Sequence, residues 1–182
     1  MASVIEKYLR TYSEFRDSDP SRNAPSFRRA AFVPACHEPA EAVPRLLAAW
    51  CASGHADLLV FVVNGRVDAA PEQTEANAKF LAEIARHTTA RESNDEVVFR
   101  SHEASAPGAR VAVVDRTQGS RRLGVKEGVG RARRIGFDLT LALHAAGKLE
   151  SPWVGSTDAD ATITSDYFES LAPRDPGVVA CL

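Results

Sequence analysis

Residues 58–63 form an unbroken run of six apolar residues, Leu-Leu-Val-Phe-Val-Val, which ends at an Asn-Gly pair. A strand with one face in water would alternate apolar and polar residues, so a continuous run indicates a strand covered on both faces. Asn-Gly favours a turn, which places the end of the strand there. Residues 57–63 therefore predict an inner strand of a sheet packed between two layers of helices.

Segments typical of strands and of helices alternate along most of the chain. Apolar residues at helical spacing predict helices over residues 41–51, 71–87 and 128–146, with Gly147 suited to the end of the last one. This alternation is typical of parallel strands joined by helices, so we expect a three-layer α/β/α, Rossmann-like fold with a mostly parallel central sheet. The other strands are expected at 29–35, 97–100, 110–115, 153–157 and 178–182, with loops over 101–108 and 116–127 and a short helix over 165–171.

The N-terminal part of the chain has a different composition. Residues 2–16 place apolar side chains near one face of an expected helix, and residues 17–27 are rich in Asp, Ser and Pro, as in a linker. We therefore expect a helix and linker over residues 1–27 and one domain over residues 28–182, a length that a single core can serve.

Charge and cysteine usage exclude several classes of protein. The net charge is −2, so no overall field draws the chain to nucleic acid or to acidic lipid. The three cysteines form no CxxC pair and cannot all pair, which is typical of a reducing compartment. No stretch approaches the roughly 20 apolar residues of a membrane span. We expect a cytoplasmic protein without a transmembrane segment.

Two carboxylates follow the expected strand at 153–157. Asp158 and Asp160 are two residues apart, so both can point to the same side of an extended or turning chain. Close carboxylates repel each other unless a cation compensates them, and Mg²⁺ or Mn²⁺ prefers such oxygen ligands. The pair predicts a metal site that faces a diphosphate, although a turn of solvated acids has the same sequence.

A basic segment precedes and opens the expected helix at 128–146. Lysine and arginine next to a helix N-terminus favour anions, and Lys126 is the best candidate there to hold a diphosphate. A solvated helix face with charges three and four residues apart is an equally good interpretation. The segment comprises Arg116, Arg121, Arg122, Lys126, Arg131, Arg133 and Arg134.

Four segments, in order over residues 29–172, resemble the family 2 glycosyltransferases of the GT-A type. VPACHEP is similar to the end of that family's first strand, and VVNGRVD to the acidic turn after its second strand. The spacing from Gly130 to Gly136 is similar to the family's Gly-Ala-Arg-Asn helix, and STDADATITSDYF to its DxD strand. This chain departs from the pattern at His37, Asn64 and Arg134, where the family usually has Asn, Asp and Asn.

The resemblance implies a glycosyltransferase that binds a nucleotide-diphosphate sugar with Mn²⁺ or Mg²⁺. Asp160 would be the principal metal ligand, and Asp158 would contact the metal or the ribose. The other implied nucleotide-sugar-binding residues are Glu38, Asn64, Asp68 and Arg134. Because the family's acceptor site and catalytic base lie beyond the DxD strand, we expect a donor-binding part without the acceptor-binding part, and the sequence assigns neither an acceptor nor a catalytic residue.

Three other functional interpretations fit parts of the sequence. DADAT also resembles the DxDxT signature of haloacid-dehalogenase-type phosphatases, in which Asp158 would be the nucleophile and Asp160 the general acid. A sugar-phosphate nucleotidyltransferase shares the sheet type but opens with a glycine-rich loop, which residues 34–39 lack. The third alternative is a non-catalytic nucleotide-binding module. The expected strand at 178–182 would leave a sheet edge open, and we expect self-association there.

Overall fold

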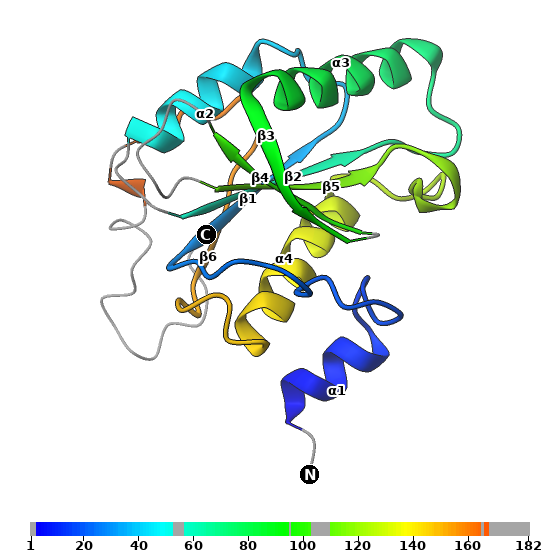
Figure 1. Cartoon of the computed structure of the whole chain (residues 1–182). Coiled ribbons are helices and arrows are strands. Elements are labelled where there is room, and N and C mark those ends of the chain that lie inside the picture. Colours follow the sequence, from blue (N-terminus) through cyan, green and yellow to red (C-terminus); the bar gives the residue numbers. More distant parts are fainter. Residues whose placement is uncertain (1–2, 53–56, 95, 103–109, 165, 168–182) are drawn as a thin grey trace.

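A computed structural model of the chain describes residues 3–52, 57–94, 96–102, 110–164 and 166–167 (Figure 1). In this part, a six-stranded sheet is flanked by helices. The helices are α1 (Val4–Thr11), α2 (Ala42–Ala52), α3 (Pro71–His87) and α4 (Val129–Ala145), with a short 3-10 turn η1 (Gly119–Arg121). The strands are β1 (Ala30–Ala35), β2 (Leu58–Asn64), β3 (Thr88–Ser93), β4 (Val98–His102), β5 (Arg110–Arg116) and β6 (Val154–Ser156).

The sheet has the strand order β3-β4-β5-β2-β1-β6. Strands β5, β2, β1 and β6 are parallel to one another, whereas β4 is antiparallel to both β3 and β5. This confirms the mixed α/β class and the mostly parallel sheet. The apolar run at 58–63 lies in β2 between two neighbouring strands and is buried along its whole length, as predicted.

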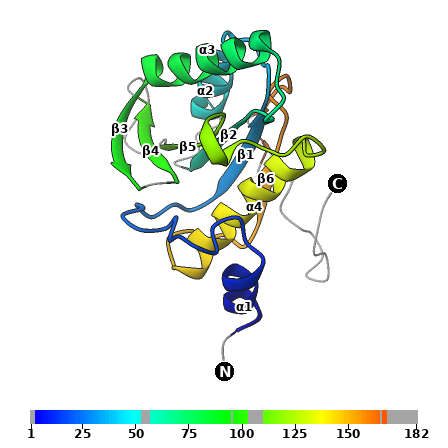
Figure 2. The same cartoon turned by 90° about the vertical axis from the view of Figure 1, so that its right-hand side faces the viewer.

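Helices cover both faces of the sheet (Figures 1 and 2). Helices α2 and α3 lie on one face, where Trp50 and Phe80 pack with Phe61. Helix α4 lies on the other face, where Leu139 packs with Phe32. Neighbouring residues of a strand point to opposite faces, so each inner strand contributes to both apolar clusters, which explains its continuous hydrophobicity.

The N-terminal segment packs against α4 (Figure 2). Asp138 of α4 is buried and accepts hydrogen bonds from the Tyr8 hydroxyl (2.9 Å) and the Glu14 main-chain amide (2.8 Å). Phe15 and Phe27 join the apolar cluster beneath α4. The segment thus shares a core with the sheet.

Several predicted elements differ from the structure. The helix expected over 2–16 ends at Thr11, because the chain then turns inward and buries Ser13 and Phe15. Strand β3 was not predicted: most of it is exposed and polar, so no apolar alternation marks it. The loop expected at 101–108 was placed too early at its start, because β4 extends through His102. The helix expected over 165–171 falls almost entirely, and the strand over 178–182 entirely, outside the described residues.

No helix within the described ranges combines the length and the apolar character that crossing a bilayer requires.

Candidate functional site

The direction in which the chain winds through the sheet reverses between β1 and β6. Helix α2 leads from β1 to β2 across one face, and α4 leads from β5 to β6 across the other (Figure 1). Strands β1 and β6 are parallel neighbours, so their carboxyl ends lie at the same edge. Ligands of open α/β sheets bind at such a reversal, outside the carboxyl ends of the strands. The residues that follow β1 and β6 are therefore the candidate site.

The turn after β6 presents Asp158 and Asp160 to solvent. Between them, Ala159 is 1% exposed and packs in the cluster beneath α2, so the two carboxylates flank an anchored residue. Arg45 of α2 holds this turn through hydrogen bonds from its guanidinium to the carbonyl oxygens of Ala159 (2.6 Å) and Ala161 (2.8 Å). The packing of Ala159 and the hydrogen bonds from Arg45 thus fix the positions of both aspartates.

The turn after β1 brings Glu38 toward these aspartates. His37 has a positive φ of 63°, and its main-chain amide donates a hydrogen bond of 2.9 Å to the side chain of Asn77. Partial burial raises the pKa of Glu38, and the charges of Asp160 and Asp158 raise it further, against a smaller opposite effect of His37. The charges of Glu38, Asp158 and Asp160 therefore act on one another as one acidic group.

Arg133 places a positive charge beside Asp158. Its guanidinium lies 2.8 Å from Oδ1 of Asp158, and both side chains are about half exposed. Arg133 lies in the second turn of α4, the helix that leads into β6. In the sequence, Arg133 belongs to the basic segment and to the helix that resembles the glycosyltransferase family, but it was not among the predicted site residues. Its position one residue before Arg134 was the available signal.

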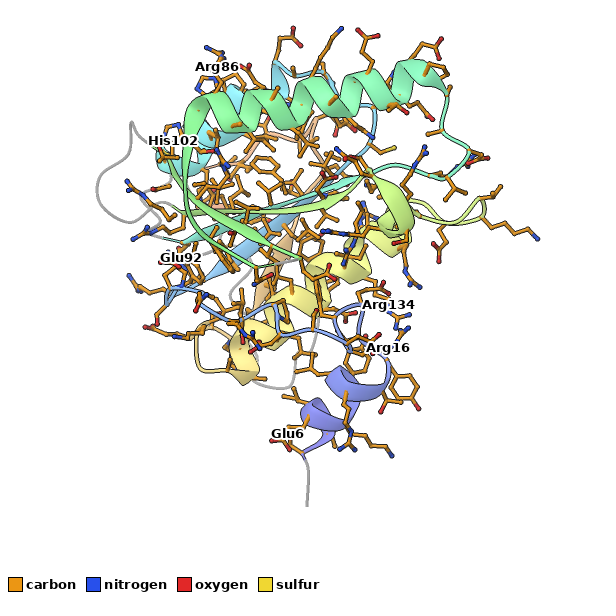
Figure 3. All side chains as sticks on the ribbon, turned by 45° about the vertical axis from the view of Figure 1, so that its right-hand side comes forward. Glu6, Arg16, Arg86, Glu92, His102 and Arg134 are labelled. Carbon is orange, nitrogen blue, oxygen red and sulfur yellow. The ribbon has the colours of Figure 1, made fainter. Side chains whose placement is uncertain are left out.

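Arg134 points elsewhere. Its guanidinium contacts the main-chain oxygen of Tyr12 and lies 3.5 Å from Glu14 and 3.8 Å from Asp138, so it binds the N-terminal segment (Figure 3). Residues that follow one another in a helix point about 100° apart, and this separates the directions of Arg133 and Arg134. The structure therefore does not bring Arg134 to the carboxylates. Lys126 is exposed in the loop before α4.

Asn64 and Asp68 follow the end of β2. Asn64 is buried, and its side-chain amide donates to the carbonyl oxygen of Ala35 at 3.0 Å, which ties the ends of β2 and β1 together. Asp68 is exposed and forms a two-pronged ion pair with Arg66, with both contacts at 2.8 Å. Asn64 thus braces the edge of the site, and Asp68 already has a cationic partner there.

Whether the acidic group fits a divalent cation depends on chemistry and on geometry. Its oxygen donors are those that Mg²⁺ and Mn²⁺ prefer. Among the described residues, however, no group of three or more His, Cys, Asp or Glu side chains is already positioned to hold an ion. Asp158 is instead bonded to Arg133. The donor set fits the cation in kind, and binding would require a local rearrangement of side chains.

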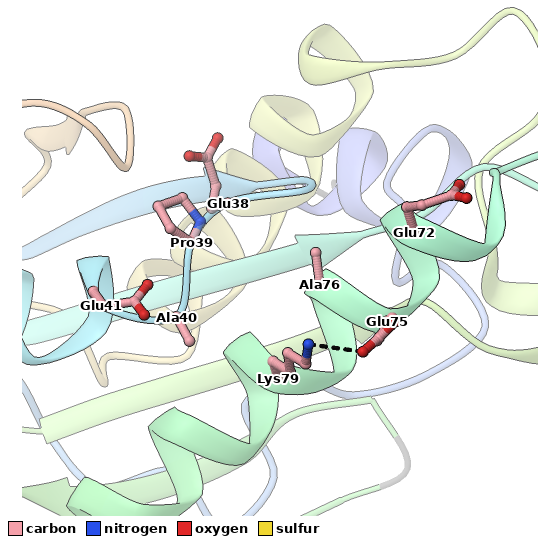
Figure 4. Close-up of a pocket in the computed structure, with 8 residues that line it drawn as sticks. All are labelled: Glu38, Pro39, Ala40, Glu41, Glu72, Glu75, Ala76 and Lys79. Carbon is pink, nitrogen blue, oxygen red and sulfur yellow. Dashed lines mark ion pairs between the residues drawn. The ribbon is translucent and has the colours of Figure 1, made fainter.

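A cleft of about 340 Å³ adjoins the acidic group on the side of α2 and α3 (Figure 4). Four of its lining residues are glutamates, whereas Lys79 is its one cation and is paired with Glu75 at 2.7 Å. Such a surface repels a diphosphate, so we expect anionic ligands on the Arg133 side of Glu38. The lining residues are Glu38, Pro39, Ala40, Glu41, Glu72, Glu75, Ala76 and Lys79.

Comparisons with protein-family models, with curated proteins and with solved structures found no match to this chain.

Proposed function

We propose that the protein is a metal-dependent glycosyltransferase that binds a nucleotide-diphosphate sugar at the carboxyl ends of β1 and β6. The observation that supports this most directly is the convergence of Glu38, Asp158 and Asp160 at the point where the winding of the sheet reverses. Carboxylate oxygens at such an edge are donors that a divalent cation prefers, and a cation at a ligand-binding edge suits a diphosphate. The acceptor of the sugar is unassigned.

In this proposal, Asp158 and Asp160 hold Mn²⁺ or Mg²⁺, with Asp160 as the principal ligand. When bound, the ion would offset the charge that develops on the departing nucleoside diphosphate. Arg45 keeps the aspartate turn in place through its two hydrogen bonds to main-chain oxygens. Glu38, Asn64 and Asp68 border the nucleoside side of the site, and Lys126 lies in the loop before α4, from where it can approach the diphosphate.

Two further proposals concern the protein as a whole. We place it in the cytoplasm, because three cysteines without a pairing pattern are typical of a reducing compartment. We also propose that it self-associates, since a strand over 178–182, as expected from the sequence, would leave a sheet edge open to pairing with another chain. A strictly monomeric species at every accessible concentration, measured by sedimentation, would refute self-association.

Calorimetric titration tests the donor site. UDP, GDP and their sugars are titrated with and without Mn²⁺ into the wild type, Asp160→Ala and the control Asp166→Ala, which removes an exposed carboxylate from the same segment. We expect one nucleotide to bind in a metal-dependent manner to the wild type and the control, and this binding to be lost in Asp160→Ala. If no nucleotide binds under any condition, the proposal is wrong.

A further inference from the structure

We infer that Arg133 is an internal counter-ion. It pairs with the carboxylate of Asp158 in the free protein and leaves this carboxylate when a divalent cation and a diphosphate bind. This inference rests on the proposed function and assigns a positioning role to a residue that the proposal itself does not use. It predicts that the protein binds cation and diphosphate cooperatively, because one side chain must respond to both.

The ion pair between Arg133 and Asp158 is one in which other ions can replace the guanidinium. The distance of 2.8 Å is that of a charge-assisted hydrogen bond, yet both side chains are about half exposed. Ion pairs at exposed sites contribute little net stability, so water and ions can replace them at small cost. A permanent structural pair in this chain is different: Arg116 is buried beside Glu96 at 2.6 Å and stacks over Phe15.

The neighbouring arginines of α4 have other partners. Arg131 pairs with Glu14 at 2.8 Å and with Glu127 at 3.4 Å, and Arg134 binds the N-terminal segment. Both are therefore tied to parts of the chain away from the acidic group. Arg133 is thus the arginine of this helix whose described partner belongs to the candidate metal site.

The aspartate turn keeps its place without Arg133. Arg45 bonds two of its carbonyl oxygens, the buried Ala159 anchors it, and the amide of Ala161 donates to the carbonyl oxygen of Asp158 at 3.1 Å. Departure of the guanidinium would therefore free a carboxylate that is already oriented. This is the arrangement expected of a contact that can be exchanged without refolding the site.

The charges make the exchange specific for a divalent ion. Arg133 supplies one positive charge to Asp158, whereas Mg²⁺ or Mn²⁺ would supply two. If the ion bound the second oxygen of Asp158, it would still lie within a few ångströms of the guanidinium and would repel it. A diphosphate offers the displaced guanidinium a bidentate anionic partner, so its arrival favours the exchange.

The first experiment measures cation binding alone. MgCl₂ and MnCl₂ are titrated calorimetrically into the wild type, Arg133→Gln and the control Arg131→Gln, which removes the same charge two residues away on the same helix. We expect Arg133→Gln to bind the cation about twofold to fivefold more tightly than the wild type, the gain that corresponds to an exposed ion pair. Arg131→Gln should bind as the wild type does. Circular dichroism confirms that each variant is folded, and Arg133→Ala, which also removes the charge, replaces Arg133→Gln if the latter is not.

The second experiment measures the coupling. The affinity of UDP or GDP is compared with and without cation, and we expect the ratio to be smaller in Arg133→Gln than in the wild type. Equal cation affinities in wild type and Arg133→Gln, or an equal gain in Arg131→Gln, overturn the role of Arg133. If these results occur while Asp160→Ala abolishes cation binding, the proposed function survives alone. No cation binding in wild type or Arg133→Gln, with or without nucleotide, overturns both.

Discussion

The side chain of Asn77 donates a hydrogen bond of 2.8 Å to the main-chain oxygen of Asn64, and both residues are buried. The other end of the same amide accepts from the main chain of His37 at 2.9 Å. One residue of α3 thus ties the turn after β1, which carries Glu38, to the end of β2.

Replacement of Asn77 should therefore destabilise the fold. Asn77→Ala leaves a buried carbonyl oxygen without its donor, and we expect a loss of about 1–3 kcal/mol in the free energy of unfolding. Urea denaturation measures it, with Lys79→Ala on the exposed side of the same helix as the control. A loss no larger than that of the control would contradict the bracing role.

Gly136 is the contact point between α4 and β1. A Cβ atom added there would lie 2.5 Å from Cγ of Phe32, a buried ring that cannot easily move. We expect Gly136→Ala to lower the free energy of unfolding by about 1–3 kcal/mol through overpacking. Gly130→Ala on the same helix meets no atom within 4 Å and should be neutral or stabilising by up to about 1 kcal/mol. Thermal denaturation of the two variants distinguishes a packing effect from a general effect of alanine.

Arg45 should matter more for the order of the aspartate turn than for global stability. Because Arg45→Gln cannot bridge the carbonyl oxygens of Ala159 and Ala161, we expect faster hydrogen exchange at the Ala161 amide, with only about 1 kcal/mol lost in global stability. Hydrogen exchange followed by NMR measures both. Arg45→Lys, which keeps the charge but not the fork, should resemble Arg45→Gln; wild-type exchange in both variants would show that the clamp is unimportant.

Glu38 makes the stability of the protein depend on pH. Since burial and the two aspartates raise its pKa in the folded chain, its contribution to stability is complete below the unfolded value of about 4.3 and is lost as pH rises through the folded value. Glu38→Gln should therefore lose less stability than the wild type between those two values, as measured by denaturation at a series of pH values. Glu41→Gln, which removes a charge from the same cleft, is the control.

A divalent cation should reverse part of this shift. If Mg²⁺ binds Asp158 and Asp160, it offsets the charges that raise the pKa of Glu38, and the pKa should fall when the ion is added. Carboxyl carbon resonances followed by NMR during a pH titration measure the change. The same pKa with and without saturating Mg²⁺ would mean that no ion binds near Glu38.

The inner part of the sheet could be predicted because its residues are constrained on both faces. The six apolar residues that begin with Leu58 indicate a strand covered on both faces. The Asn-Gly pair marks the end of this strand to within one residue. Strand β3 could not be predicted in the same way. Its residues from Ala90 to Ser93 are exposed, so no burial pattern distinguishes them from a loop.

The candidate site could be predicted in part for a similar reason. Residues directly after a strand lie at the carboxyl edge of the sheet, so the sequence places Glu38, Asp158 and Asp160 at that edge, whereas the pairing of β1 with β6 that makes them neighbours came from the structure. The direction of a helical side chain depends on the rotation of the helix, which sequence spacing does not give. The choice between Arg133 and Arg134 therefore required the structure, as did the role of Asn77 as a brace.

The buried methyl group of Ala159 links two properties of the chain that selection usually acts on separately. A larger residue at this position would have to push into the packing beneath α2, and it would displace the turn that carries the two acids. A glycine would release the turn and enlarge the range of angles between those acids. The packing of the core and the orientation of the two carboxylates thus depend on one position, and a library of variants at residue 159 should show thermal stability and affinity for the proposed cation declining together.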